Sequence, residues 1–163
     1  MSNYEFVIGL RAIRHYRDEP LKEVHLTAIL EAARWTGSSK NLQKWSFVVV
    51  QERQRLGRLA ACGDFTSPLR DSAATVAVVE EPGGYEFDSG RAAQNIMLAA
   101  CAVGVVSCPI TLHRDEDAAR VLELPEGRRC RYAIALGYPT DDAAPARFGG
   151  RKPFDELVHW ERY

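Results

Sequence analysis

The stretch FDSGRAAQNIMLAACAVG, residues 87–104, decides the fold because it predicts the longest helix in a chain of 163 residues. Ala92, Ile96 and Ala99 recur at helical spacing along one side of this segment, and Gly104 suits the left-handed residue that often ends a helix. Small and apolar side chains also occupy its other sides, and a helix that is apolar nearly all round must be buried nearly all round. In a chain this short, we expect a second copy to supply part of that burial.

Shorter helices and strands alternate on both sides of this segment. Periodic apolar residues predict helices over residues 4–11, 21–35, 53–61 and 115–122, and clusters of β-branched and aromatic residues predict strands over residues 45–51, 73–80, 108–112 and 131–136. Interleaved strands and helices are typical of a sheet that carries helices on both faces. We therefore expect one domain, residues 1–163, with its sheet between two helical layers.

Composition and charge exclude several classes of protein. Lys and Arg together number 21 and Asp and Glu 22, so the net charge of −1 gives no reason to expect a nucleic acid or an anionic membrane as partner. The N-terminus lacks the basic and apolar parts of a signal peptide, and the longest apolar run, residues 96–106, is too short to span a bilayer. These features indicate a cytoplasmic protein. The cysteines have no CxxC spacing, and we expect all of them to be reduced thiols of the core: Cys62, Cys101, Cys108 and Cys130.

The C-terminal part, residues 140–163, is predicted to be an extended tail because proline and glycine recur in its first half. Its last segment, residues 157–163, nevertheless carries two aliphatic and two aromatic side chains besides a histidine, which loose tails seldom do. This segment either folds back on its own domain or wraps around a neighbouring copy, and we expect the second arrangement.

No hydrolytic or metal-binding constellation is recognisable in the sequence. The histidines, at positions 15, 25, 113 and 159, are scattered, and none pairs with another histidine or cysteine at ligand spacing. Glycine-rich phosphate-binding loops and the GxSxG nucleophile motif are also absent from the sequence. If the protein is an enzyme, we therefore expect a cofactor to carry the reaction.

Two basic clusters are candidates for binding a phosphate. Arg11 and Arg14 lie three residues apart and would share a face of a helical turn. The second cluster lies in the irregular tail and consists of Arg147, Arg151 and Lys152. Arginine forks match phosphate oxygens, so arginines that converge from distant segments can hold a phosphate; the alternative is an ordinary solvated surface. The polar stretch at residues 37–41 offers hydroxyl and backbone N–H groups to an oxyanion, or is simply a turn.

Four separated motifs occur along the chain. They are LRAIRHYRDEPL (residues 10–21), LEAARW with GSSKNLQKW (30–35 and 37–45), DSGRAAQNIMLAA with Gly104 and SCPI (88–100 and 107–110), and GYP with RKPFDELVH (137–139 and 151–159). In this order they resemble the nitroreductase family of FMN-dependent enzymes, nearly from end to end. The resemblance implies an α+β fold: a three-layer α-β-α sandwich with a central, mostly antiparallel sheet, in an intertwined homodimer with FMN at the subunit interface.

The resemblance also implies which residues meet the cofactor. Arg11, Ala12 and Arg14 match the segment that meets the FMN phosphate and the polar edge of the ring, and Arg151 matches a basic residue near the phosphate. Ser38, Ser39 and Asn41 match a loop that reaches FMN from the partner chain, and Pro109, Ile110, Thr111 and Leu112 match the stretch along the isoalloxazine ring. No catalytic side chain is implied, because hydride passes through flavin N5. The implied reaction is ping-pong transfer from NADH or NADPH to a nitroaromatic, a quinone or a similar electron-poor acceptor.

Three positions depart from the family pattern. Leu10 stands in place of an arginine, Ala12 in place of a serine, and Lys44 in place of the proline before a tryptophan. Together with the absence of long inserted helices, these departures imply a more open site and weaker flavin binding. One alternative is therefore a flavin- or nucleotide-binding protein of the same fold without efficient turnover. Another is a specialised relative, such as a reductive dehalogenase or a flavin-degrading enzyme.

Overall fold

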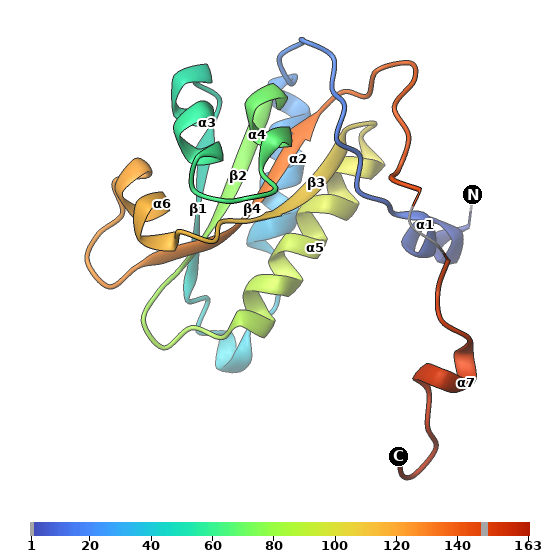
Figure 1. The fold of residues 1–163 in the computed structure, drawn as a ribbon. Helices are drawn as coiled ribbons and strands as arrows, with labels where there is room; N and C mark the ends of the chain where they lie inside the picture. The colour runs from blue at the N-terminus through green and yellow to red at the C-terminus, as the bar shows by residue number, and fades with distance from the viewer. Residues whose placement is uncertain (1, 148–149) are drawn as a thin grey trace.

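Four antiparallel strands form the central sheet of the protein in a computed structural model that describes residues 2–147 and 150–163. The strands are β1 (Trp45–Val50), β2 (Ala74–Glu80), β3 (Val106–Thr111) and β4 (Arg129–Gly137), in the spatial order β1-β2-β4-β3 (Figure 1). Neighbouring strands pair antiparallel throughout, with register partners such as Val48 and Ala77 or Cys108 and Ala135. The predicted strands are confirmed to within about two residues at each end, and so is the antiparallel sheet.

Helices cover both faces of this sheet (Figure 1). One face carries α2 (Glu23–Arg34) and α5 (Glu86–Ala102), and the other carries α3 (Arg53–Ala60), α4 (Ser67–Asp71) and α6 (Asp115–Val121). Alternate residues of each strand face opposite layers, as the two-residue repeat of a strand requires: Val76 and Val78 join the first layer, whereas Ala77 and Val79 join the second. The predicted three-layer sandwich is confirmed. None of the helices in the described part of the chain is long and apolar enough to cross a membrane.

The first helix is shorter than the sequence predicts. α1 (Asn3–Gly9) ends before Leu10, whose backbone is extended, so Arg11 and Arg14 do not share a helical turn, and this part of the prediction is wrong. The Arg11 guanidinium donates to the carbonyl oxygens of Ile8 and Leu10 at 2.7 and 2.8 Å, which satisfies carbonyl groups left open by the helix end. The chain then runs extended, and the Ile13 N–H donates to the Ser107 carbonyl oxygen at the edge of β3 at 2.9 Å.

The long helix α5 is buried on the side that faces the sheet and α2. Ala92, Ile96 and Ala100 are fully buried, and Met97 and Leu98 are half-buried. Cysteine burial is less uniform than predicted. Three cysteines are core thiols, Cys62, Cys108 and Cys130, but Cys101 lies on the exposed side of α5, so the expectation of a fourth core thiol is wrong.

The C-terminal tail leaves the body of the molecule (Figure 1). Its only regular element among the described residues is the single turn α7 (Phe154–Leu157), and no side chain from Gly150 onward is buried. Large apolar groups are left open to solvent there: Phe154 is 71% exposed, Trp160 78%, and Tyr163 fully. The tail therefore does not fold back into the core of its own chain.

Candidate functional site

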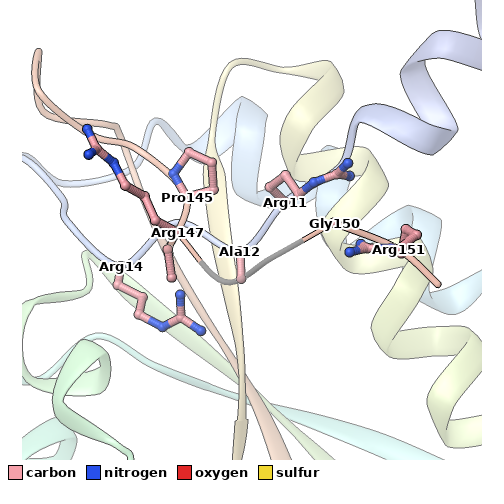
Figure 2. Close-up of a pocket in the computed structure, with 8 residues that line it drawn as sticks. Arg11, Ala12, Arg14, Pro145, Arg147, Gly150 and Arg151 are labelled. Carbon is pink, nitrogen blue, oxygen red and sulfur yellow. The ribbon is translucent and has the colours of Figure 1, made fainter.

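Four arginines from the two ends of the chain meet around one cavity. The extended segment after α1 contributes Arg11 and Arg14, and the tail contributes Arg147 and Arg151. The cavity measures about 730 Å³ and is completed by Ala12, Pro145, Ala146 and Gly150. Figure 2 shows Arg11 and Arg151 on one side of Ala12 and Arg14 and Arg147 on the other. The structure thus brings together four of the predicted site residues: Arg11, Ala12, Arg14 and Arg151.

These four guanidinium groups have no carboxylate partner among the residues that the structure describes. Most other arginines of the chain do form ion pairs: Arg17, Arg34, Arg53, Arg55, Arg91, Arg114, Arg120, Arg128 and Arg129. The described residues that line the cavity include no acidic side chain. Four uncompensated positive charges repel one another, so the arrangement favours an anionic ligand, and guanidinium forks suit phosphate oxygens in particular.

An apolar hollow adjoins this cationic cavity and shares three of its residues, Arg11, Ala12 and Arg151. It measures about 610 Å³. Its remaining lining comes from the start of the chain, from α5 and from β3, namely Val7, Ile8, Leu10, Gln94, Met97 and Pro109. A ligand with an anionic end and a flat apolar body would match the two cavities together. FMN has this composition, so the residues present fit that cofactor.

The residues of β3 divide between the site and the core. The side chains of Ile110 and Leu112 are buried in the core layer of α3, α4 and α6. They therefore do not reach the hollow. Pro109 is exposed and lines the hollow, and Thr111 is half-buried. Because Ser107 accepts the Ile13 N–H and Leu112 donates to β4, the alternation along β3 turns the backbone groups of Pro109 and Thr111 toward the outer edge of the sheet.

Two buried titratable groups, Tyr16 and Cys108, lie near enough to Arg14 to feel its charge. Burial raises the pKa of the Tyr16 hydroxyl and of the Cys108 thiol above their ordinary values, and the charge of Arg14 only partly opposes this. The Tyr16 hydroxyl donates to the Ile13 carbonyl oxygen at 3.0 Å. Both groups therefore stay protonated at neutral pH, and neither is activated as a nucleophile or a base.

The loop with the other predicted site residues lies elsewhere. Ser38 precedes the short 3₁₀ turn η1 (Ser39–Asn41), which lies at the N-terminal end of α5 and lines neither cavity (Figure 1). Lys44 donates from Nζ to the Pro82 carbonyl oxygen at 3.0 Å and also lines neither cavity. Within one chain, the serines and Asn41 are therefore not brought to the arginines.

Several residues that line the two cavities lie outside the set of site residues predicted from the sequence. The charge of Arg147 makes it a candidate for binding a phosphate, but no motif marks it as a residue of the FMN site. Helical spacing places Gln94 on the side of α5 opposite the buried Ala92 and Ile96, but Met97 is half-buried at the margin of the core, so spacing alone does not mark it as part of the wall of the apolar hollow. The wall formed by α1 depends on where that helix sits in the fold, which local sequence does not encode.

The sequence is similar to those of known proteins along most of its length. The profile of the Nitroreductase family matches residues 9–82 and 73–138, which is most of the chain. The chain belongs to the nitroreductase family. It is 29% identical over 143 residues to a putative NADH dehydrogenase/NAD(P)H nitroreductase of Archaeoglobus fulgidus, covering 81% of this chain and 82% of that one.

Solved structures of nitroreductases share the fold. An FMN-dependent nitroreductase from Clostridium difficile R20291 superposes with a TM-score of 0.87 at 25% identity, over 98% of this chain and 99% of that one. A putative NADH dehydrogenase/NAD(P)H nitroreductase from Bacteroides thetaiotaomicron superposes with a TM-score of 0.86 at 25% identity, over the whole of both chains. The predicted family and the predicted nitroreductase-like α+β fold are confirmed.

Proposed function

We propose that the protein is an FMN-dependent oxidoreductase that transfers hydride from NADH or NADPH to a nitroaromatic, a quinone or a similar electron-poor acceptor. The observation that carries this proposal is the cationic cavity of Arg11, Arg14, Arg147 and Arg151 joined to an apolar hollow, in a chain of the nitroreductase family. FMN, when bound, supplies the redox chemistry by accepting and donating hydride. The side chains of the protein bind and orient it.

Each part of the site has a separate task in this proposal. Arg151 and Arg11 bind the phosphate, and the contacts of Arg11 with the carbonyl oxygens of Ile8 and Leu10 fix its guanidinium in place. Arg14 lines only the cationic cavity and adds positive charge there. The outer edge of β3 at Pro109 and Thr111 lies along the ring, with Met97 of α5 forming the apolar wall of the hollow. This leaves one face of the site open to the two substrates.

A homodimer completes this site. Ser38, Ser39 and Asn41 are remote from the arginines in one chain, so a second copy must supply them if they meet the cofactor. The chain also exposes large apolar groups that association would bury, at α1 (Tyr4, Val7 and Ile8) and in the tail (Phe154, Leu157, Trp160 and Tyr163). In this arrangement the tail, residues 140–163, wraps around the partner subunit. The free thiol of Cys101 on the surface suits a reducing compartment such as the cytoplasm.

The test is a spectroscopic titration followed by turnover. Purified protein is mixed with FMN, its visible spectrum is recorded, and NADH or NADPH is added in the absence of oxygen. Loss of the flavin absorbance, followed by its return on addition of a quinone or nitroaromatic, supports the proposal. Parallel double-reciprocal plots are expected, because donor and acceptor use the same open face in turn.

The second candidate is a flavin-binding protein without efficient turnover. Leu10, an uncharged residue, lies in the lining of the apolar hollow next to Arg11, where the family pattern has an arginine. If FMN binds but neither NADH nor NADPH bleaches it, this second function replaces the first. If FMN does not bind at all, both functions are rejected.

A further inference from the structure

The loop between α2 and β1 is held in a strained conformation. Three residues without the freedom of glycine have left-handed backbones within four positions: Lys40 (φ 50°), Asn41 (φ 55°) and Gln43 (φ 50°). Such conformations are unfavourable for side-chain-bearing residues and persist only where the surroundings enforce them. The loop also binds itself, because the Ser38 hydroxyl oxygen accepts the Gln43 N–H at 2.9 Å. This internal hydrogen bond does not offset three unfavourable backbone conformations, so contacts from outside the loop must stabilise its shape.

One face of α5 provides that support. Asp88, Arg91 and Asn95 are spaced three and four residues apart, which places them on the same side of the helix. The Asp88 carboxylate accepts the Ser39 N–H at 3.1 Å, Arg91 Nη1 donates to the Gly37 carbonyl oxygen at 2.8 Å, and Asn95 Nδ2 donates to the Thr36 hydroxyl oxygen at 2.8 Å. We call these three α5 side chains the α5 clasp.

The burial of Asp88 makes its hydrogen bond to the loop important for stability. Asp88 is only 6% exposed, and a buried carboxylate is unfavourable unless hydrogen-bonded and paired. Its partners are the loop N–H of Ser39 and Arg91, whose Nη1 lies 3.7 Å from Oδ1. Opening the loop would leave this carboxylate with one partner fewer. Asp88 and Arg91 thus stabilise the loop, and the loop in turn supplies hydrogen-bond partners to both side chains.

We infer that Asp88, Arg91 and Asn95 are positioning residues that hold the Ser38–Asn41 loop in the shape with which it contacts FMN in the partner subunit. The inference rests on the proposed function, because the loop's ligand is the proposed FMN. None of the three side chains lines the two cavities of its own chain, so their action on FMN runs through the loop. Loss of the α5 clasp would free a strained loop, and binding FMN would then require the loop to be ordered again.

The experiment combines flavin affinity with hydrogen exchange on the full chain. Arg91→Gln removes the charged partner of the buried Asp88 by changing a half-exposed side chain, and a thermal unfolding curve shows whether the variant is folded. Arg91→Lys keeps the positive charge and a single donor nitrogen. The control is Arg120→Gln, which breaks an Asp117–Arg120 pair of the same three-residue spacing on the exposed side of α6.

The expected result has three parts. Arg91→Gln weakens FMN binding about fivefold or more and speeds amide exchange over residues 36–44, whereas Arg91→Lys restores most of the affinity and Arg120→Gln changes neither quantity. Asn41→Ala weakens FMN in the wild-type background, but adds little to Arg91→Gln, because both act on the same contact. This loss of additivity would not arise if the α5 clasp served stability alone.

Failure of the inference is distinguishable from failure of the proposed function. If the wild-type protein binds FMN and Arg91→Gln speeds exchange in the loop without weakening FMN, the positioning role is rejected while the proposed function stands. Strict additivity of Arg91→Gln and Asn41→Ala also rejects it. If the wild-type protein does not bind FMN, the proposed function fails, and the inference falls with it.

Discussion

Replacing Arg151 by alanine should weaken FMN binding roughly ten- to a hundredfold while leaving riboflavin binding nearly unchanged. Arg151 lines both the cationic cavity and the apolar hollow and has no carboxylate partner within the described parts of the chain. Its guanidinium is therefore available to a phosphate without a competing anion. Hydrogen bonds to charged groups contribute about 1.5–3 kcal/mol, and each 1.4 kcal/mol is about a factor of ten in affinity. Riboflavin lacks the phosphate, so it does not use this contact.

The assay is a fluorescence titration of both flavins against three proteins: the wild type, Arg151→Ala and Lys152→Ala. Lys152 is the matched control, because it is the next residue, carries the same charge, is exposed, and lines neither cavity. Its removal lowers only the general positive potential, which is screened over about 8 Å at physiological salt. We expect Lys152→Ala to change FMN affinity less than twofold, and the Arg151 effect to shrink as salt is raised.

Two results would refute this reasoning. Equal losses of FMN and riboflavin affinity in Arg151→Ala would mean that Arg151 supports the fold of the site rather than the phosphate. An equal loss of FMN affinity in Lys152→Ala would mean that the net charge of the tail matters and the geometry of the cationic cavity does not.

Three further outcomes are expected. Deleting residues 157–163 should weaken both dimerisation and FMN binding, and a shortened chain that sediments as a fully flavin-loaded dimer would contradict the wrapped tail. A thiol reagent should modify Cys101 in the folded single chain, with the three buried cysteines reacting only on unfolding, as mass spectrometry of the labelled peptides can establish; protection of Cys101 in the dimer would place the second copy on the exposed side of α5. Because burial raises the pKa of the Cys130 thiol from near 9 to about 12, the unfolded chain loses this proton first as the pH rises. The free energy of unfolding should therefore fall above about pH 9, and denaturant titrations of Cys130→Ala should show a shallower fall; an unchanged slope would assign it to other groups.

The elements that could be predicted from the sequence are those with a local cause. β-branched runs and helical stripes are properties of neighbouring residues, so the four strands and the helices α2, α3, α5 and α6 lie close to their predicted positions. The five-residue helix α4 is too short to show a periodic pattern, and it was not predicted. α1 ends early because Arg11 binds the carbonyl groups at its end and the next residues lie along β3, contacts that only the tertiary structure supplies.

In the site, too, some features have a local cause in the sequence and others depend on the tertiary structure. The period of a strand already separates Pro109 and Thr111 from Ile110 and Leu112, so the sequence held the information that the latter two side chains enter the core. The convergence of Arg11 and Arg14 with Arg147 and Arg151 could not be read in this way, because more than a hundred residues separate the two pairs in the chain. Charge identified the candidates, and only the fold shows that they share one cavity.

The position of the loop has a consequence for assembly. The α5 clasp holds the loop with Ser38, Ser39 and Asn41 at the N-terminal end of α5, whereas the cationic cavity is lined by the segment after α1 and by the tail. If FMN contacts both, it binds the dimer more tightly than it binds one chain. By thermodynamic linkage FMN must then strengthen the dimer by the same factor by which dimerisation strengthens FMN binding. In the proposed dimer, burial of the exposed apolar tail on the partner and binding of FMN by the unpaired arginines would therefore strengthen each other.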